Sequence, residues 1–298
     1  MIHDNLTHVK KIANASKAKK LFKLGVKYIY AIGFAKLIYP VTKRGTRKTC
    51  KTFFGETMQV ILPAGTDIYL AGGKTHDSEI RLVKFLISNL HRGEVFIDVG
   101  AHFGYFSLLA SKLIEKEGRV FSFEPSNIFF LLKENAEGKE NIKSFKKAIT
   151  DTNSEIEFYE FPELYSEFNT TNSDQFKKES WIRKYAPKQI KISSITIDQF
   201  IEEQDVRPSL IKIDVEGAEL KVLKGAKNTL SQFSPIVVME FLHHERSDDV
   251  YTQAHNLMIE SGYASNIINS EGQLKPVHHV DEYLAANNLE SENVVYIK

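Results

Sequence analysis

From residue 94 onward, short apolar runs alternate with longer amphipathic runs, and this alternation restricts the fold more than any other feature. Five runs have the length and apolar character of buried strands: residues 95–99, 119–123, 143–147, 210–213 and 235–240. Four runs have helical spacing of apolar residues: 106–113, 128–137, 218–230 and 250–261. Two more strands are expected near 264–268 and 293–297. The pattern predicts an α/β fold in which helices cover both faces of a mainly parallel sheet.

The first ninety residues do not follow this alternation. Residues 52–70 alternate between apolar and polar side chains around a turn at 63–65, which predicts a β-hairpin, and residues 77–91 have helical spacing. We therefore expect three parts: an N-terminal helical arm over 1–51, a hairpin and helix over 52–90, and the main domain over 91–298. The stretch 161–191 is long for a loop and is expected to be a lid or substrate loop with some helix of its own.

Charge is distributed unevenly along a chain whose formal total is +1. Residues 1–51 contain thirteen Lys and Arg and one acid, Asp4, which leaves 26 basic and 37 acidic residues for the remainder. Such asymmetry is typical of a basic arm that contacts a nucleic acid or a membrane. Cys50 is the only cysteine, which excludes an intrachain disulfide, and the sequence lacks a cysteine–histidine pattern with zinc spacing.

The arm includes an apolar run over residues 21–39, which Lys23, Lys27 and Lys36 interrupt. A lysine at the centre of a spanning helix costs about 2.5–3.5 kcal/mol, so a transmembrane helix is not expected. A secretory signal is excluded because the run begins too far along the chain and no small-residue cleavage site follows. Two interpretations stay open: a peripheral membrane contact through residues 8–48, or packing of the apolar side on the body or a second subunit.

A glycine turn follows the first strand, in the sequence Val95-Phe-Ile-Asp98-Val-Gly100-Ala-His102-Phe-Gly104. At the carboxyl end of a strand in an open sheet, such a turn lets a ligand approach the backbone. The spacing is not the Gly-x-Gly-x-x-Gly of nicotinamide cofactors, and an acid before the glycines would attract a cationic group. The amino group and sulfonium of S-adenosylmethionine are such groups. The alternative is a purely structural strand–turn–helix.

The second strand also ends in an acid, Glu124, twenty residues after Gly104. A carboxylate at this position can accept hydrogen bonds from both ribose hydroxyls of a nucleoside. Pro125 ends the strand and can border an adenine. Glu124 alone would equally suit the region of a helix N-terminus, but the two signals together favour a nucleoside-bearing cofactor.

Charged residues mark two later strands as well. Lys212 lies inside the apolar strand 210–213, where a lysine needs a partner or a purpose. The acids and histidines that follow the strands at 210–213 and 235–240 are Asp214, Glu216, Glu219, Glu240, His243 and His244.

The segments IDVGAHFGYFS, FSFEPS, SSITIDQF and LIKIDVEGAELKVLKGA resemble those of the FkbM-type methyltransferases. The resemblance covers about residues 79–297 and leaves out 1–51. It implies a class I, Rossmann-like methyltransferase fold with a seven-stranded, mainly parallel sheet. It also implies S-adenosylmethionine as cofactor and O-methylation as the activity, with the catalytic domain at 91–298.

The resemblance implies a role for each matching position. The methionine part of the cofactor would be held by Asp98, Gly100 and Gly104, with His102 in place of the Asn that related sequences commonly have. Glu124 would bind the ribose, and the residues at or near the adenine would be Pro125, Ser126, Ala148 and Asp151. Asp214 and Glu216 would line the gap between cofactor and acceptor.

Methyl transfer to a hydroxyl requires alignment of the acceptor and a base for its proton. The candidate bases are Asp214, Glu240, His243 and His244, of which a histidine has the best unperturbed pKa. Lys212 is expected to orient Asp214 or Glu240. As an alternative, Asp214, Glu240 and His243 would hold a divalent cation that acidifies the hydroxyl. Glu216 and Glu219 would also suit the start of a helix, with no role in the chemistry.

These observations favour an O-methyltransferase that acts on a hydroxyl of a sugar, a polysaccharide or a related small molecule. One alternative is an RNA methyltransferase that uses the basic arm, but the strand tip IDVEGAE lacks the Asn/Asp-Pro-Pro-aromatic sequence expected for attack on base amino groups. Another is a non-catalytic binding module, which the acids at four strand tips disfavour. The expected location is cytoplasmic, and a peripheral contact on the inner membrane face and an oligomer both stay open.

Overall fold

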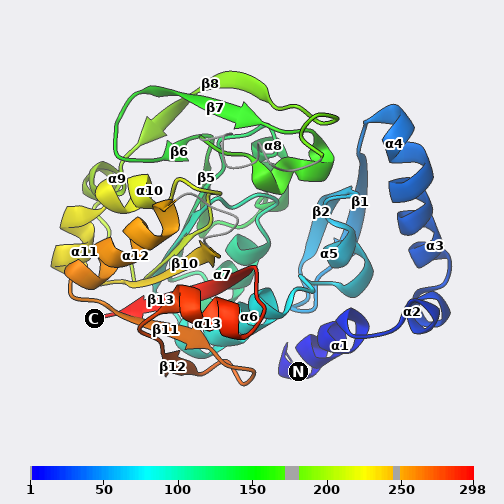
Figure 1. Ribbon diagram of the computed structural model, residues 1–298, viewed down its shortest axis with the longest axis horizontal. Coiled ribbons are helices and arrows are strands. Elements are labelled where there is room, and N and C mark those ends of the chain that lie inside the picture. The colour runs from blue at the N-terminus through cyan, green and yellow to red at the C-terminus, as the bar shows by residue number, and fades with distance from the viewer. Residues whose placement is uncertain (1, 172–180, 244–248) are drawn as a thin grey trace. The chain divides into compact units, whose positions relative to one another are not determined.

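The computed structural model describes residues 2–171, 181–243 and 249–298. The chain forms two compact units (Figure 1). The first consists of Met1–Ile80 together with Phe161–Phe168, and the second of Arg81–Glu160 and Asn169–Lys298. The three-part division expected from the sequence stays a prediction.

The second unit is built on an eight-stranded sheet whose centre is parallel. Its strands lie in the order β5 (Ile142–Phe145), β4 (Arg119–Phe123), β3 (Val95–Val99), β9 (Leu210–Ile213), β10 (Ile236–Leu242), β13 (Ser291–Ile297), β11 (Ala264–Ile268) and β12 (Leu274–Pro276). The five from β5 to β10 are parallel, and β13 is antiparallel to both of its neighbours. The expected seven-stranded class I fold is confirmed, with the short edge strand β12 as an addition.

The helices expected from the periodicity are present, and two further helices were not expected. Together they are α6 (Asp77–Asn89), α7 (Tyr105–Ile114), α8 (Phe129–Asn135), α9 (Ile197–Gln204), α10 (Glu219–Lys224), α11 (Lys227–Phe233), α12 (Val250–Glu260) and α13 (Val280–Ala286). The two unexpected helices are α9 and α13. The helix expected over 218–230 is divided into α10 and α11 at Gly225. A Cβ atom at Gly225 would lie 2.2 Å from the carbonyl oxygen of Thr150, so the backbone approaches that loop too closely for a side chain.

Alternate residues of the central strands face opposite sides, which separates an apolar face from a partly polar one. Residues such as Val99 and Ile213 join one buried cluster with α9, α10, α11 and α12. The intervening residues include Asp98 and Lys212, and they contact α7 through Ser107 and Phe106 respectively. The polar residues of the sheet therefore lie beneath α7.

A smaller three-stranded sheet in the second unit contains β6 (Ala148–Ile149), β8 (Lys188–Ile195) and β7 (Glu155–Glu160). Part of the stretch expected to be an irregular loop is therefore regular, because β8 begins at Lys188. Residues 172–180 of that stretch lie outside the described residues.

The first unit holds a run of helices and a hairpin. The helices are α1 (Ile2–Ala13), α2 (Lys17–Leu24), α3 (Val26–Gly33), the π-helical turn η1 (Phe34–Ile38), α4 (Tyr39–Thr42), α5 (Thr66–Ala71) and the 3₁₀ helix η2 (Glu163–Phe168). None of the helices in the described part of the chain has the length and apolar character needed to cross a bilayer.

The hairpin of the first unit begins earlier than the sequence predicts. β1 (Thr46–Lys51) pairs with β2 (Thr57–Leu62), so the turn lies at residues 52–56, and residues 66–71 form a helix. The hydroxyl of Thr52 bridges the turn by donating to the carbonyl of Glu56 and accepting from its N–H. Only one residue of β1, Cys50, is buried, so the strand lacks the apolar alternation that would have revealed it.

Candidate functional site

Three polar residues form a row across the central strands of the second unit. Ser122 of β4 pairs in register with Asp98 of β3, and Asp98 pairs with Lys212 of β9. All three are buried. Polar side chains in a sheet interior need partners, and the row together with α7 supplies them.

Lys212 connects the tips of β3 and β9. Its Nζ lies 3.0 Å from Oδ2 of Asp214 and 3.7 Å from Oδ1 of Asp98. The Lys212 side chain is 3% exposed and that of Asp98 is 1% exposed, whereas that of Asp214 is 37% exposed. Lys212 therefore neutralises the carboxylate of Asp98, which water cannot reach. It also orients the carboxylate of Asp214, which water can reach. The expected pairing of Lys212 with Asp214 is present.

Asp98 is held by α7 as well as by the sheet. Ser107 Oγ donates to Asp98 Oδ2 over 2.6 Å, and Ser122 Oγ donates to Ser107 Oγ over 2.8 Å. Burial raises the pKa of Asp98, while Lys212 and the Ser107 hydrogen bond act in the opposite direction. Neither serine was singled out in the sequence, although Ser122, Asp98 and Lys212 each stand next to last in their strand.

The loop after β3 is fixed by backbone contacts on two sides. The N–H groups of Gly100 and Ala101 both donate to the carbonyl of Phe123, over 3.0 and 2.9 Å. Gly100, His102 and Gly104 all have positive φ, of 81°, 48° and 84°. A Cβ atom at Gly100 would lie 1.8 Å from the carbonyl oxygen of Asp214. The glycine thus allows the β3 loop to lie directly against the tip of β9.

This close approach predicts that Gly100→Ala is strongly destabilising. The positive φ and the clash together are expected to cost about 2–5 kcal/mol of unfolding free energy. Gly93→Ala is the matched control, because Gly93 has φ 83° and a Cβ atom there would have no neighbouring atom within 4 Å. Urea denaturation measures the loss of unfolding free energy in both variants. Gly93→Ala reports the cost of the positive φ alone, and Gly100→Ala reports that cost plus the clash. An equal loss in the two variants would contradict the close contact at Gly100.

Glu124 at the tip of β4 is held by three hydrogen bonds. Its Oε2 accepts from the N–H of His102 over 2.9 Å, and its Oε1 accepts from the N–H and hydroxyl of Ser126 over 3.0 and 2.5 Å. Burial raises the pKa of Glu124, and these hydrogen bonds oppose that rise. Three of about four acceptor positions of the carboxylate are occupied, which leaves one on Oε2. Ser126 is itself fully buried, so it orients Glu124.

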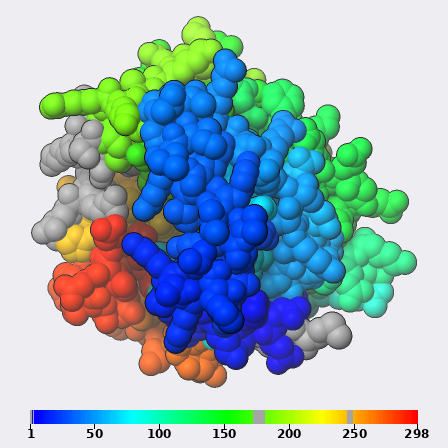
Figure 2. All heavy atoms as spheres, turned by 90° about the vertical axis from the view of Figure 1, so that its right-hand side faces the viewer, coloured from blue at the N-terminus to red at the C-terminus, as the bar shows by residue number. Residues whose placement is uncertain are grey.

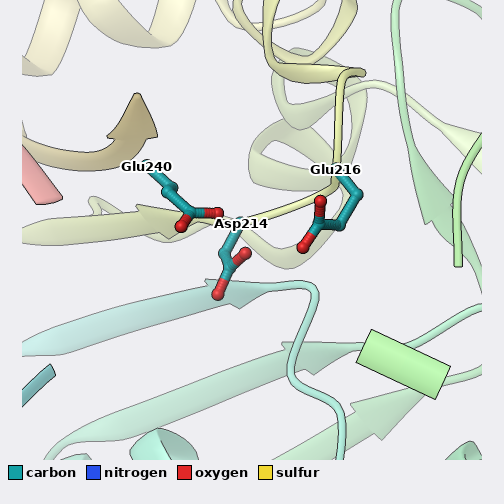
Figure 3. A group of neighbouring side chains, drawn as sticks. All are labelled: Asp214, Glu216 and Glu240. Carbon is teal, nitrogen blue, oxygen red and sulfur yellow. The ribbon is translucent and has the colours of Figure 1, made fainter. Parts of the chain in front are cut away.

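Three carboxylates converge where β9 and β10 end. One oxygen each from Asp214, Glu216 and Glu240 lie within 4.8 Å of one another (Figure 3). All three residues are partly exposed. Figure 3 shows Asp214 and Glu216 in the loop beyond β9 and Glu240 on the neighbouring strand β10, which ends two residues later at Leu242. Carboxylates at this spacing can hold a divalent cation or act on a bound hydroxyl.

The loop bearing Glu216 is supported from both sides. Glu219 accepts from the N–H of Val215 over 3.1 Å and from that of Gly217 over 2.9 Å, and its burial raises its pKa to about 7. Thr170 Oγ1 donates to the carbonyl of Glu216 over 2.6 Å. Glu219 therefore has the structural role considered from the sequence, and Thr170 is a support that the sequence pattern did not reveal.

The structure changes the candidate cation set. Within the described residues, the cluster comprises Asp214, Glu216 and Glu240, and His243 is not part of it. The backbone N–H of His243 donates to the carbonyl of Glu290, 2.9 Å away, which ties this residue to the segment before β13. His244 lies outside the described residues. A role of His243 in holding a cation with Asp214 and Glu240 therefore stays a prediction, and Glu216 is a further candidate ligand.

The remaining predicted residues lie near the carboxyl ends of β4 and β5. Pro125 follows Glu124 directly and is partly exposed. Ala148 belongs to β6 and is buried with Phe158 and Ile192. Asp151 is exposed and accepts a hydrogen bond from the Thr150 hydroxyl over 3.1 Å. Contacts of these residues with an adenine stay a prediction.

Comparisons with known proteins agree with the resemblance. Residues 98–288 match the family model described as the methyltransferase FkbM domain. The chain is similar to the hexuronic acid methyltransferase AglP of Haloferax volcanii, with 24% identity over 160 residues, covering 53% of this chain and 60% of the relative. The chain thus spans less than two thirds of that protein.

Two solved structures are similar to the chain at lower identity. A methyltransferase FkbM from Methylobacillus flagellatus is 18% identical, with 79% of this chain and 53% of that chain covered and a TM-score of 0.42. An S-adenosylmethionine-dependent O-methyltransferase from Thermotoga maritima is 11% identical, with 84% and 77% covered and a TM-score of 0.42.

Proposed function

Because the chain belongs to the FkbM methyltransferase family, we propose that it transfers a methyl group from S-adenosylmethionine to a hydroxyl of a saccharide. The observation that carries the proposal is the direct contact of the β3 loop with the tip of β9 at Gly100 and Asp214. This contact brings the loop expected to hold the cofactor beside the converging carboxylates. The sugar class follows from the similarity to a hexuronic acid methyltransferase.

The residues of the β3 and β4 tips fit the cofactor chemically. Glu124 keeps one acceptor position for a ribose hydroxyl, and its other oxygen is fixed by Ser126. Asp98 is fully buried, so we assign it to holding Lys212 and α7 and not to a direct cofactor contact. When bound, S-adenosylmethionine supplies an electrophilic methyl group on its sulfonium. Gly100, His102 and Gly104 would shape the backbone around its methionine part.

At the acceptor side, we assign Asp214 as the base that removes the hydroxyl proton. Lys212 favours the ionised form of this carboxylate and fixes its orientation through a 3.0 Å contact. Asp214 is also the member of the ion pair that solvent reaches, so an acceptor can reach it too. Glu216 and Glu240 converge on the same point, where they would orient the acceptor or share a divalent cation with Asp214.

The role of Glu124 predicts a large loss of cofactor affinity in Glu124→Gln. Replacing a charged acceptor by an amide removes a charge-assisted hydrogen bond worth about 1.5–3 kcal/mol, or roughly 10–150-fold in affinity. Calorimetric titration with S-adenosylmethionine measures the change. Glu137→Gln, at an exposed position after α8, is the matched control and should keep full affinity. Unchanged affinity in a folded Glu124→Gln variant would refute the ribose assignment.

The proposed function is tested by transfer of a labelled methyl group. The purified chain and its Asp214→Asn variant are incubated with labelled S-adenosylmethionine and separate panels of saccharides containing hexuronic acids, RNA and proteins. Label in the saccharide fraction, dependent on Asp214, is the expected result. Label in RNA alone would replace the proposal with nucleic-acid methylation. Cofactor binding with no transfer to any hydroxyl-bearing acceptor would count against the proposed activity.

A further inference from the structure

An exposed apolar surface runs along the helices of the first unit. We name it the apolar stripe and define it by Phe22, Val26, Ile29, Leu37 and Val41. Phe22 is 91% exposed, Val26 81% and Val41 82%. From Val26 on, the residues recur every three or four positions or at twice that spacing, which aligns them along one side of α3, η1 and α4. Figure 2 shows the outer surface of these helices in blue.

The stripe is not the side by which these helices are attached to their own unit. Ala31, Phe34 and Tyr39, on the other side, are buried. The Tyr39 hydroxyl also accepts from the N–H of Leu164, 3.0 Å away. The amphipathic segment therefore has one apolar side that is used for folding and a second that faces solvent. The sequence alone could not separate these sides, because the same run of residues supplies both.

The surroundings of the stripe are strongly basic. Residues 17–44 contain eight Lys and Arg and no acid: Lys17, Lys19, Lys20, Lys23, Lys27, Lys36, Lys43 and Arg44. Lys19, Lys23 and Lys36 are exposed beside the apolar residues. Soluble proteins rarely expose a continuous apolar patch unless it binds something. Because residues 17–44 carry basic charge only, a partner of this patch should combine apolar groups with negative surface charge.

We propose that the apolar stripe and its lysines form a binding surface for an anionic lipid bilayer. Phe22, Val26 and Val41 would enter the boundary between headgroups and acyl chains, and the lysines would contact lipid phosphates. A second copy of the chain fits less well. A twofold dimer through this surface would bring the exposed Lys19, Lys23 and Lys36 of two copies together, with no acid in residues 17–44 to offset them. The inference does not rest on the proposed methyl transfer.

The test is flotation of the full chain with phosphatidylcholine vesicles, with and without phosphatidylglycerol. Binding is expected with the anionic vesicles and should weaken as salt is added. The variant Phe22→Ser/Val26→Ser/Val41→Ser should bind at least roughly tenfold more weakly. A variant with Lys19, Lys23 and Lys36 changed to Gln should lose a similar factor on anionic vesicles. All substituted side chains are exposed, so folding should be unaffected, and thermal melting verifies this.

The matched control is Phe130→Ser/Ile259→Ser, which removes two exposed apolar side chains of the second unit. This control should bind as the unchanged chain does. Negligible binding of the unchanged chain to anionic vesicles would overturn the proposal. Equal binding by the stripe variant and the control would overturn it as well. Sedimentation that reveals a dimer abolished by the stripe variant, without vesicle binding, would assign the surface to a second copy.

Discussion

Asp214→Asn is expected to lower the turnover of methyl transfer by roughly 10²–10⁴-fold, the contribution of a general base, while S-adenosylmethionine affinity stays unchanged. The amide keeps the shape of the side chain but cannot accept the hydroxyl proton. Asp214 lies beyond β9, whereas the proposed ribose contact, Glu124, follows β4, so the two functions should separate. Single-turnover kinetics and calorimetry on the same preparation measure them.

Two comparison variants make this experiment specific. Glu216→Gln and Glu240→Gln remove the other carboxylates of the cluster without touching the Lys212 contact. If Asp214 is the base, both should lower turnover less than Asp214→Asn does. Similar losses in all three variants, together with inactivation by a chelator, would instead indicate a shared divalent cation. Full turnover in Asp214→Asn would refute the assignment.

Much of the second unit could be predicted because its strands are buried on both faces. Such strands appear as continuous apolar runs, and a charged residue inside one, such as Lys212, is conspicuous. Their parallel arrangement also implies that strand tips meet at one edge, which is why Asp214 and Glu240 could be placed together from the sequence.

Other features depend on contacts that the sequence pattern does not carry. Nothing in the sequence around Ser107 and Thr170 marks these two residues as part of the site. Their hydrogen bonds to Asp98 and to the Glu216 carbonyl can be seen only in the folded structure. The position of Glu216 beside Asp214 and Glu240 depends on the loop after β9, in which Glu216 has a positive φ of 51°. The early hairpin strand was missed because β1 buries only Cys50.

Lys212→Met is expected to lower the unfolding free energy by about 3–5 kcal/mol, since removing one partner of a buried ion pair leaves an uncompensated charge. The side chain of Asp98 is 1% exposed, so water cannot replace the lysine there. Urea denaturation measures the loss. Lys143→Met, at an exposed position of β5 in the same sheet, is the matched control and should change stability little.

In the same variant, the pH dependence of stability that arises from Asp98 should become stronger, with a defined sign. Without Lys212 the pKa of Asp98, which burial already raises above its usual value of 3.8, should rise further. The native state then binds a proton more tightly than the unfolded state, so stability falls as the pH increases from about 3.8 through the raised pKa. The unfolding free energy that Lys212→Met loses relative to the unchanged chain should therefore be smaller at acidic pH and larger at neutral pH.

A double-mutant cycle identifies which carboxylate needs the lysine for stability. Asp214 lies closer to Lys212 than Asp98 does, at 3.0 against 3.7 Å, but its side chain is 37% exposed and can be hydrated alone. We therefore expect Asp98→Asn to rescue part of the stability lost in Lys212→Met, and Asp214→Asn to rescue less. If Asp214→Asn instead rescued more stability than Asp98→Asn, the shorter distance to Lys212 would matter more than the deeper burial of Asp98. Lys212 would then serve mainly the carboxylate that faces the acceptor.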